Sequence, residues 1–193
     1  MSIKYILVGG YPWKAPDEGK SFWLEMAKGF KEPIKVLECL FARPKESWQK
    51  AFEEDENNVA KHLKDKEVIL EMANEENFSE QVKGSDAIYI RGGNEEKYTL
   101  EILKKNKDWI KNLSGKVLAG TSAGADLMSK YYYNLDTLQI CEGLGILPIK
   151  VIVHWQSDYN TPNIDWDKAY QELKNYKEDL PIVTLREGEY KVF

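Results

Sequence analysis

The sequence predicts an α/β protein in which helices cover both faces of a mainly parallel sheet. Short apolar runs rich in β-branched residues alternate along the chain with longer segments whose apolar residues recur at helical spacing. This alternation is typical of strand–helix–strand units, which build a parallel sheet between two helical layers. The composition allows a packed core, because 42% of the 193 residues are hydrophobic and 12% are aromatic. We therefore expect a three-layer sandwich formed by residues 1–193 as a single domain.

The order of the apolar runs sets the expected elements. Strands are expected at 4–10, 34–41, 68–73, 86–94 and 115–122. Amphipathic helices are expected after each of them, at 20–30, 45–65, 77–85, 95–113 and 123–132. After residue 133 the pattern changes to short strands and turns, followed by a helix at 166–177 and a terminal strand or hairpin at 181–193.

The charged residues argue against some classes of partner. Lysines alternate with glutamates on the helical segments and the net charge is −5, so the clustered positive surface that nucleic acid binding requires is not evident. No apolar run approaches the roughly 18 residues of a membrane span. Cys39 and Cys141 lie far apart and have no metal-ligand spacing. We expect a cytoplasmic protein with no nucleic acid or membrane partner and no bound metal. The sequence leaves the formation of a homodimer undecided.

Residues 120–124, GTSAG, fit the pattern G-x-S-x-G between a predicted strand and a predicted helix. At such a corner Ser122 is held in a strained backbone conformation that presents its side chain outward. Strand and helix pass close together there, which requires small neighbours such as Gly120 and Gly124. The helix directs free N–H groups toward the serine and favours a developing anion. The alternative is a glycine-rich turn in which Ser122 caps the helix.

A serine nucleophile needs a base, and the chain has two histidines. His62 lies in a charged helical segment, where we expect an exposed residue without a catalytic role. His154 ends an apolar strand and begins a loop, so it is the candidate base, although a strand-end histidine with a satisfied hydrogen bond has the same pattern. The base in turn needs an orienting acid. The spacing leaves Asp126, Asp136 and Asp158 open for that role.

An oxyanion hole needs a second N–H beside that of Ala123. The predicted strand at 86–94 ends in Gly92 and Gly93, which can bring backbone N–H groups close to a substrate without interference from a Cβ atom. The alternative is a plain turn at the exit of a strand. In open α/β sheets the working residues gather at the carboxyl ends of the strands, so these glycines are expected beside Ser122.

Four further residues are candidates for substrate contacts. Asn94 ends the exit turn of the same predicted strand, next to the glycine pair, and shares its carboxyl end. Arg91 lies just before the glycine pair and offers a positive charge, although a surface arginine at a strand end is the plainer interpretation. Trp155 and Tyr159 follow His154 and are expected to form an aromatic wall, with local packing as the alternative.

These residues, in this order, resemble peptidase family S51, the group of dipeptidase E and cyanophycinase. In that family a strand ends in G-G-N, a later strand ends in G-x-S-A-G-A, an Asp follows in the next loop, and a G-L-G-L-L-P segment precedes a strand ending in His. In this chain the motifs are IRGGN (90–94), GTSAGA (120–125), Asp136, GLGILP (143–148) and VIVH (151–154). The combined pattern is much more specific than the serine corner alone.

The resemblance implies a fold of the flavodoxin-like or class I glutamine amidotransferase-like type. It implies that Ser122 is the nucleophile, His154 the base and Asp136 the orienting acid. The N–H groups of Gly93 and Ala123 then form the oxyanion hole. The family needs no metal or other cofactor, so none is expected.

The function favoured by the sequence is that of a serine peptidase of S51 type, which hydrolyses a small peptide or a related amide through a Ser-His-Asp triad and an acyl-enzyme. One alternative is a non-catalytic protein of the same fold that binds a small ligand, and another is an esterase or amidase of a different lineage. Family members carry an arginine-containing segment after the histidine, whereas residues 155–177 contain no arginine. Specificity for aspartyl dipeptides is therefore not predicted.

Overall fold

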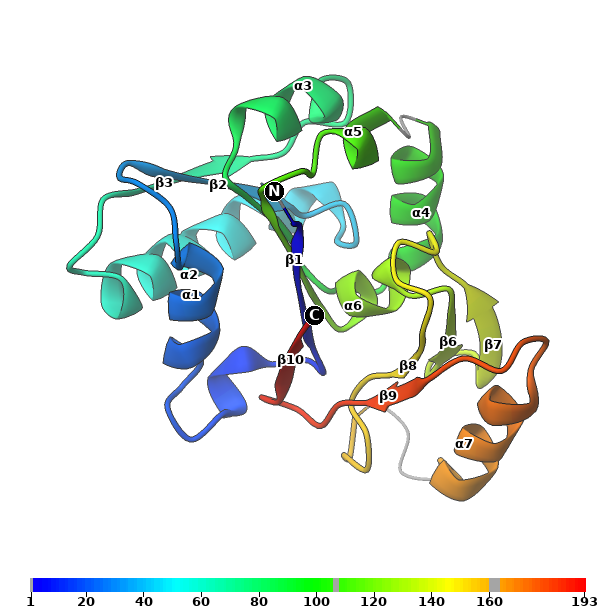
Figure 1. Cartoon of the computed structure of the whole chain (residues 1–193). Coiled ribbons are helices and arrows are strands. Elements are labelled where there is room, and N and C mark those ends of the chain that lie inside the picture. The colour runs from blue at the N-terminus through cyan, green and yellow to red at the C-terminus, as the bar shows by residue number, and fades with distance from the viewer. Residues whose placement is uncertain (1, 106–107, 160–163) are drawn as a thin grey trace.

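The computed structural model describes residues 2–105, 108–159 and 164–193 and has the expected α/β layers (Figure 1). The strands of the main sheet are β1 (Lys4–Val8), β2 (Ile34–Cys39), β3 (Val68–Met72), β4 (Ala87–Ile90), β5 (Val117–Thr121) and β10 (Tyr190–Val192). Among the described residues this sheet has six strands in the order β10-β1-β5-β4-β2-β3. All are parallel except β10, which pairs antiparallel with β1 at one edge. The prediction of a mainly parallel sheet is confirmed.

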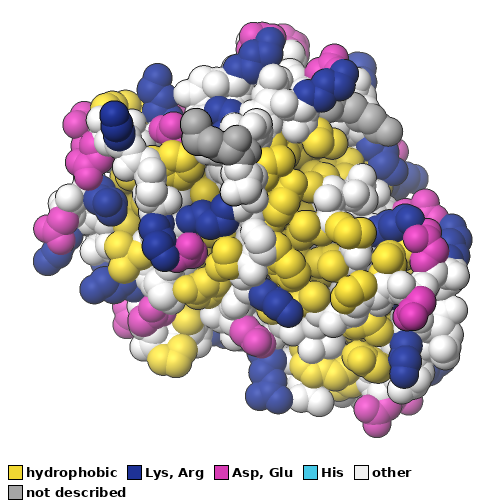
Figure 2. All heavy atoms as spheres, viewed as in Figure 1, with side chains coloured by type: hydrophobic (Ala, Val, Ile, Leu, Met, Phe, Trp, Pro, Cys, Tyr) yellow, Lys and Arg dark blue, Asp and Glu magenta, His cyan; other side chains and the backbone are white. Residues whose placement is uncertain are grey.

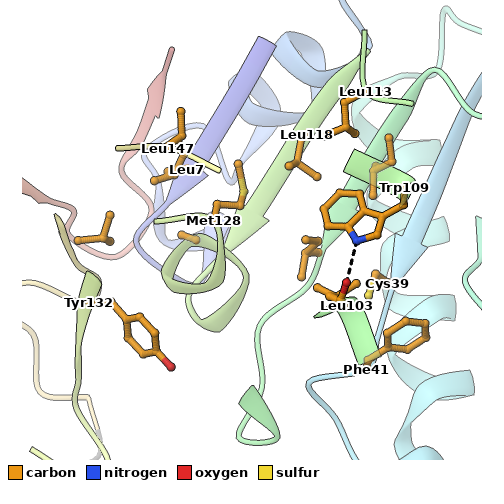
Figure 3. Packing of buried hydrophobic residues seen from close by; sticks show 14 of the residues in the cluster. Leu7, Cys39, Phe41, Leu103, Trp109, Leu113, Leu118, Met128, Tyr132 and Leu147 are labelled. Atoms are coloured by element: carbon orange, nitrogen blue, oxygen red, sulfur yellow. Dashed lines mark hydrogen bonds between the residues drawn. The ribbon is translucent and has the colours of Figure 1, made fainter. Parts of the chain in front are cut away.

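Helices cover both faces of the main sheet (Figure 1). They are α1 (Lys20–Ala27), α2 (Trp48–His62), α3 (Phe78–Gly84), α4 (Glu96–Lys105), α5 (Asp108–Lys111) and α6 (Ala123–Met128). On one face Trp23 of α1 packs among strand residues such as Val36. On the other face the buried residues of α3 to α6 form a second cluster, in which the indole N–H of Trp109 donates to the carbonyl oxygen of Leu103 at 3.1 Å (Figure 3). The two clusters exclude water from both sides of the strands.

A second, smaller sheet forms from the chain after α6. Its strands are β6 (Tyr131–Asn134), β7 (Gln139–Glu142), β8 (Lys150–Ile152) and β9 (Ile182–Thr184), and within the described residues they follow the order β7-β6-β8-β9. The helix α7 (Trp166–Asn175) packs on it through Ala169 and Leu173. Val151 and Val183 of this sheet also belong to the core cluster that covers the main sheet.

Two of the differences from the sequence prediction affect the second sheet. The helix expected at 123–132 ends at Met128, and Tyr131 already begins β6. Ser129 ends the helix in an extended conformation, with its hydroxyl donating to the carbonyl of Asp126, and the three tyrosines that follow fit a pleated sheet better than a helix. The terminal segment also divides between two sheets, because β9 joins the second sheet whereas β10 returns to the first.

Figure 2 shows how the side chains are distributed on the face seen in Figure 1. Hydrophobic side chains gather over the centre of this face, and charged side chains of both signs are interspersed around them. This arrangement agrees with the alternation of lysine and glutamate in the sequence. Within the part of the chain that the structure describes, no helix has the length and apolar character needed to cross a membrane. The single-domain, cytoplasmic and homodimer expectations stay predictions.

The order of the main sheet brings functional candidates together. β1, β5, β4 and β2 are consecutive neighbours, so the loops after their carboxyl ends open at the same edge. These loops carry Gly10, Ser122, Gly93 and Arg43 respectively. A candidate site is therefore expected at this edge of the sheet.

Candidate active site

Ser122 lies at the corner between β5 and α6, with φ 50° and ψ −120°. A positive φ at a residue with a side chain is strained, at a cost of about 1–3 kcal/mol. The corner is as tight as the sequence pattern predicts, since a Cβ atom built on Gly120 would lie 2.5 Å from the carbonyl carbon of Gly124. Ser122 makes no side-chain cap to the helix, and its Oγ lies 2.9 Å from Nε2 of His154. Ser122 thus stands at the N-cap position of α6 without capping the helix through its side chain, so the interpretation of Ser122 as a side-chain cap is wrong.

His154 follows β8 and is buried, with 2% of its surface exposed. Its φ is 50°, and its backbone N–H donates to the carbonyl of Gly9 at 2.8 Å. Gly10 leaves room for the ring, because a Cβ atom at that position would lie 2.2 Å from Cε1. Tyr159 stacks on the ring with the two centroids 3.9 Å apart. These contacts hold the imidazole with one nitrogen toward Ser122.

The second ring nitrogen of His154, Nδ1, lies 3.1 Å from Oε1 of Glu187. Glu187 lies in the loop between β9 and β10, and its Oε2 accepts a hydrogen bond from Nζ of Lys14. Burial acts to raise the pKa of Glu187, but the hydrogen bonds from Lys14 and His154 outweigh it and leave the pKa below its usual value. A carboxylate can only accept a hydrogen bond, so Nδ1 carries the proton and Nε2 accepts from the hydroxyl of Ser122.

Burial sets the protonation state of His154. Desolvation lowers the pKa of the imidazole and outweighs the neighbouring charge of Glu187, which raises it. The resulting pKa lies below the ordinary value of 6.5. At neutral pH the ring is therefore uncharged and able to take a proton from Ser122.

The orienting position beside His154 is occupied by a residue that the sequence reasoning did not consider. Asp136 is exposed, and its charge raises the pKa of His154 through space, but the contact with Nδ1 belongs to Glu187. Asp126 is buried in α6, where desolvation raises its pKa. Asp158 borders an open cavity next to the site. Of the four carboxylates, Glu187 is the one in hydrogen-bond contact with the ring.

Two backbone N–H groups near Ser122 are available to a ligand. A Cβ atom built on Gly92 would lie 2.8 Å from Cβ of Ser122, so the glycine turn directly adjoins the serine. The N–H of Gly92 donates to Oγ1 of Thr121 at 3.1 Å. Among the hydrogen bonds of the described residues, none engages the N–H of Gly93 or that of Ala123. The glycine turn that carries the N–H of Gly93 thus adjoins the serine corner that carries the N–H of Ala123, and the oxyanion hole implied by the family resemblance stays a prediction.

These groups open into a pocket of about 90 Å³. Asn94 and Tyr159 border it, where the sequence expected substrate contacts. Trp13 also borders the pocket, and half of its surface is exposed. The sequence did not indicate Trp13 as a site residue. The described lining consists of Tyr11, Pro12, Trp13, Arg43, Tyr89, Arg91, Gly92, Gly93, Asn94, Thr121, Ser122, His154 and Tyr159.

Trp155 does not appear among the described residues that line this pocket. Its ring packs against Trp166 and Tyr170 of α7, with centroid distances of 5.3 and 6.0 Å. The structure therefore supports the alternative interpretation of the sequence, in which Trp155 packs locally, here against α7, and not the expected substrate contact.

Arg91 borders the pocket, but its charge is directed elsewhere. Its Nε lies 3.2 Å from Asp55 and its Nη2 donates to Glu54 at 2.8 Å. Glu38 lies beside these groups, and its pKa is raised to about 10, first by burial and second by the charge of Asp55. The guanidinium of Arg91 thus compensates the buried carboxylate of Asp55 and pairs with the exposed one of Glu54, so its expected role in substrate binding is not supported. Arg43 also borders the pocket, and it forms no ion pair with the described residues, so its charge is available to a ligand.

The second histidine differs from its prediction. His62 lies at the end of α2 and is buried, with 8% of its surface exposed, so the expectation of an exposed residue is wrong. Desolvation and the neighbouring charge of Lys61 lower its pKa. Within the described ranges, no group of three or more His, Cys, Asp or Glu side chains is arranged to hold a metal ion.

Comparisons with known proteins bear on the family and the fold of this chain. The model of peptidase family S51 matches residues 45–191. The crystal structure of a peptidase from an acI-B1 Actinobacterium is similar with a TM-score of 0.69 and 25% sequence identity, covering 98% of this chain and 82% of that one. A putative peptidase E protein from Listeria monocytogenes EGD-e has a similar fold, with a TM-score of 0.64, 16% identity, and coverage of 99% and 96%. No curated protein matches the sequence.

Proposed function

The chain belongs to peptidase family S51, and from this membership we propose that it is a serine peptidase that hydrolyses a short peptide or a related amide. The observation that carries the proposal is the line of contacts from Oγ of Ser122 through both ring nitrogens of His154 to Glu187. In this proposal Glu187 takes the role that the sequence had assigned to Asp136. The catalytic groups are then serine, histidine and glutamate.

Acylation is the first step. His154 Nε2 removes the proton from Oγ of Ser122 while Oγ attacks the carbonyl carbon of the substrate. The carbonyl oxygen becomes an oxyanion, which accepts hydrogen bonds from the N–H groups of Gly93 and Ala123. The negative charge of Glu187 stabilises the imidazolium formed at His154. When the tetrahedral intermediate collapses, the imidazolium returns the proton to the leaving amine and the acyl-enzyme remains.

Deacylation repeats these steps with water. His154 takes a proton from the water molecule, whose oxygen attacks the acyl carbon of the ester on Ser122. The same two N–H groups bind the second oxyanion. Ser122 then leaves with the proton from the imidazolium, and the product acid departs. No cofactor is needed in this sequence of steps, because the protein supplies the nucleophile, the base and the oxyanion donors.

A fluorophosphonate probe tests the proposal without knowledge of the substrate. The probe phosphonylates an activated serine, so we expect one adduct per chain by intact-mass spectrometry. The adduct should be absent in Ser122→Ala and strongly reduced in His154→Ala, since each removes a member of the reacting pair. Unchanged labelling of Ser122→Ala would exclude this serine as the nucleophile. A substrate panel containing esters and dipeptides separates a peptidase from an esterase.

The surroundings of the serine bear on the type of substrate. Trp13 and Tyr11 offer an aromatic wall, and Arg43 offers a cation, so both apolar and acidic residues belong in the substrate panel. A pocket that binds peptides without turnover would instead support the non-catalytic alternative.

A further inference from the structure

Arg43 contacts the peptide group that precedes the N–H of Gly93. Its Nε donates to the carbonyl oxygen of Gly92 at 3.0 Å. The stem of the arginine lies against the same turn, since a Cβ atom built on Gly93 would lie 2.9 Å from Cγ of Arg43 and 2.0 Å from the carbonyl oxygen of Ala42. The loop after β2 therefore forms the wall behind the glycine turn.

The peptide between Gly92 and Gly93 has its two polar groups on opposite sides. In a trans peptide the C=O and the N–H point in opposite directions. Because the carbonyl of Gly92 faces the guanidinium of Arg43, the N–H of Gly93 faces the other way. At the start of the turn the N–H of Gly92 is also fixed, by Oγ1 of Thr121 at 3.1 Å. The orientation of the Gly93 donor thus depends on the hydrogen bond from Arg43.

A flip of this peptide would reverse both groups. The N–H of Gly93 would then face the guanidinium of Arg43, which has donors only. The carbonyl oxygen of Gly92 would take the place of the donor and would repel a developing oxyanion. Glycine residues permit such flips more readily than other residues, so a Gly-Gly turn needs an external contact to hold one orientation.

We propose that Arg43 is a positioning residue that holds the Gly92–Gly93 peptide with its N–H directed to the oxyanion. The inference rests on the proposed function, because it gives Arg43 a role only if an oxyanion forms beside Ser122. The guanidinium is suited to this role since its described contacts include no ion pair that would draw it from the carbonyl. Trp48 further anchors the loop, because its Nε1 donates to the carbonyl of Arg43 at 2.8 Å.

The test uses the rate of phosphonylation by a fluorophosphonate, whose phosphoryl oxygen requires the same N–H donors as the oxyanion. Arg43→Met removes the guanidinium and keeps most of the stem, whereas Arg43→Lys keeps a charge without the Nε–H donor. Lys45→Met is the matched control, because Lys45 lies on the same loop and pairs with Glu75 outside the serine pocket. Thermal unfolding of each variant reports on the fold.

We expect Arg43→Met to lower the second-order rate of phosphonylation about 10- to 100-fold, somewhat less than the roughly 10²- to 10³-fold cost of losing an oxyanion donor. Arg43→Lys should lie between Arg43→Met and the wild type, and Lys45→Met should equal the wild type. The pH midpoint of the rate should not move in either Arg43 variant, because Ser122, His154 and Glu187 stay in contact. A general loss of structure would change the midpoint and the unfolding temperature as well.

Two outcomes would overturn the inference. Phosphonylation at the wild-type rate in both folded Arg43 variants would show that the peptide holds its orientation without the guanidinium. Unchanged phosphonylation together with poorer turnover of acidic peptides alone would make Arg43 a substrate-binding residue instead. If the wild type itself is not labelled, the proposed function fails, and this result is distinct from an unchanged rate in the variants.

Discussion

Glu187→Gln tests whether the glutamate is the acid that orients His154. In the wild type Glu187 accepts the Nδ1–H at 3.1 Å, which leaves Nε2 free to accept the proton of Ser122. An amide can donate to Nδ1 instead, which places the ring proton on Nε2 and blocks that step. The same change in a Ser-His-Asp triad costs about 10⁴-fold in kcat, so we expect about a 10³- to 10⁴-fold lower rate of phosphonylation here.

Asp136→Asn is the matched comparison, because it also changes one carboxylate into its amide. In the described contacts Asp136 acts on His154 through its charge, and this charge raises the pKa of His154 less than that of Glu187 does. One pKa unit corresponds to about 1.4 kcal/mol, so a weak influence should change the rate by less than about tenfold. A large loss of phosphonylation rate in Asp136→Asn, together with a nearly normal rate in Glu187→Gln, would refute this reasoning and indicate Asp136 as the orienting acid.

Three further predictions concern the surroundings of His154. The rate of phosphonylation should rise with pH, with a midpoint below 6.5, because burial lowers the pKa of His154 and the base must be neutral. In Glu187→Gln the midpoint should fall further, since the charge of Glu187 raises the pKa of His154. A wild-type midpoint above 6.5 would contradict the assignment of His154 as the base. Gly10→Ala should reduce the rate about 100-fold, because its Cβ atom would displace the imidazole, and a normal rate would show that the ring can shift without loss. Tyr159→Ala should lower the rate of phosphonylation because it removes the ring stacked on His154. Trp155→Ala should instead lower the unfolding temperature and leave the rate of phosphonylation normal, and the reverse pattern would indicate that Trp155 contacts the substrate.

The main sheet could be predicted from the sequence because its strands are buried on both faces. Such strands are continuous apolar runs, and the helices between them show the periodicity of a single apolar face. The second sheet was less predictable. Its strands are short, and Tyr131 follows the α6 helix after only two residues, so neither periodicity had room to develop.

The serine, the histidine and the glycine turn could also be predicted, because each follows a strand within a recognisable local pattern. Glu187 could not, because its role depends on tertiary contact with His154 across 33 residues of sequence. The available signal was its place two residues after the run IVTL, in a segment otherwise interpreted as a terminal strand or hairpin. The family pattern favoured Asp136 instead, and no spacing rule could correct that choice.

The contacts of the two arginines near the glycine pair could not be predicted from the sequence either. Arg91 lies next to the glycine pair in sequence, yet its side chain pairs with Asp55 and Glu54 on α2. Arg43 is far from the glycines in sequence, yet it contacts Gly92 because β2 and β4 are neighbours in the sheet. The order of strands decides which cation reaches the pocket, and the sequence does not give that order.

The most direct test of the proposed peptidase activity is turnover of a dipeptide library by the purified chain, with Ser122→Ala in parallel. Mass spectrometry of the released amino acids would report both hydrolysis and specificity. We expect the wild type to cleave a subset of the dipeptides and Ser122→Ala to be slower by about 10⁴- to 10⁶-fold in kcat. Equal cleavage by the two proteins, or no cleavage of any dipeptide by the wild type, would contradict a serine peptidase of this substrate class.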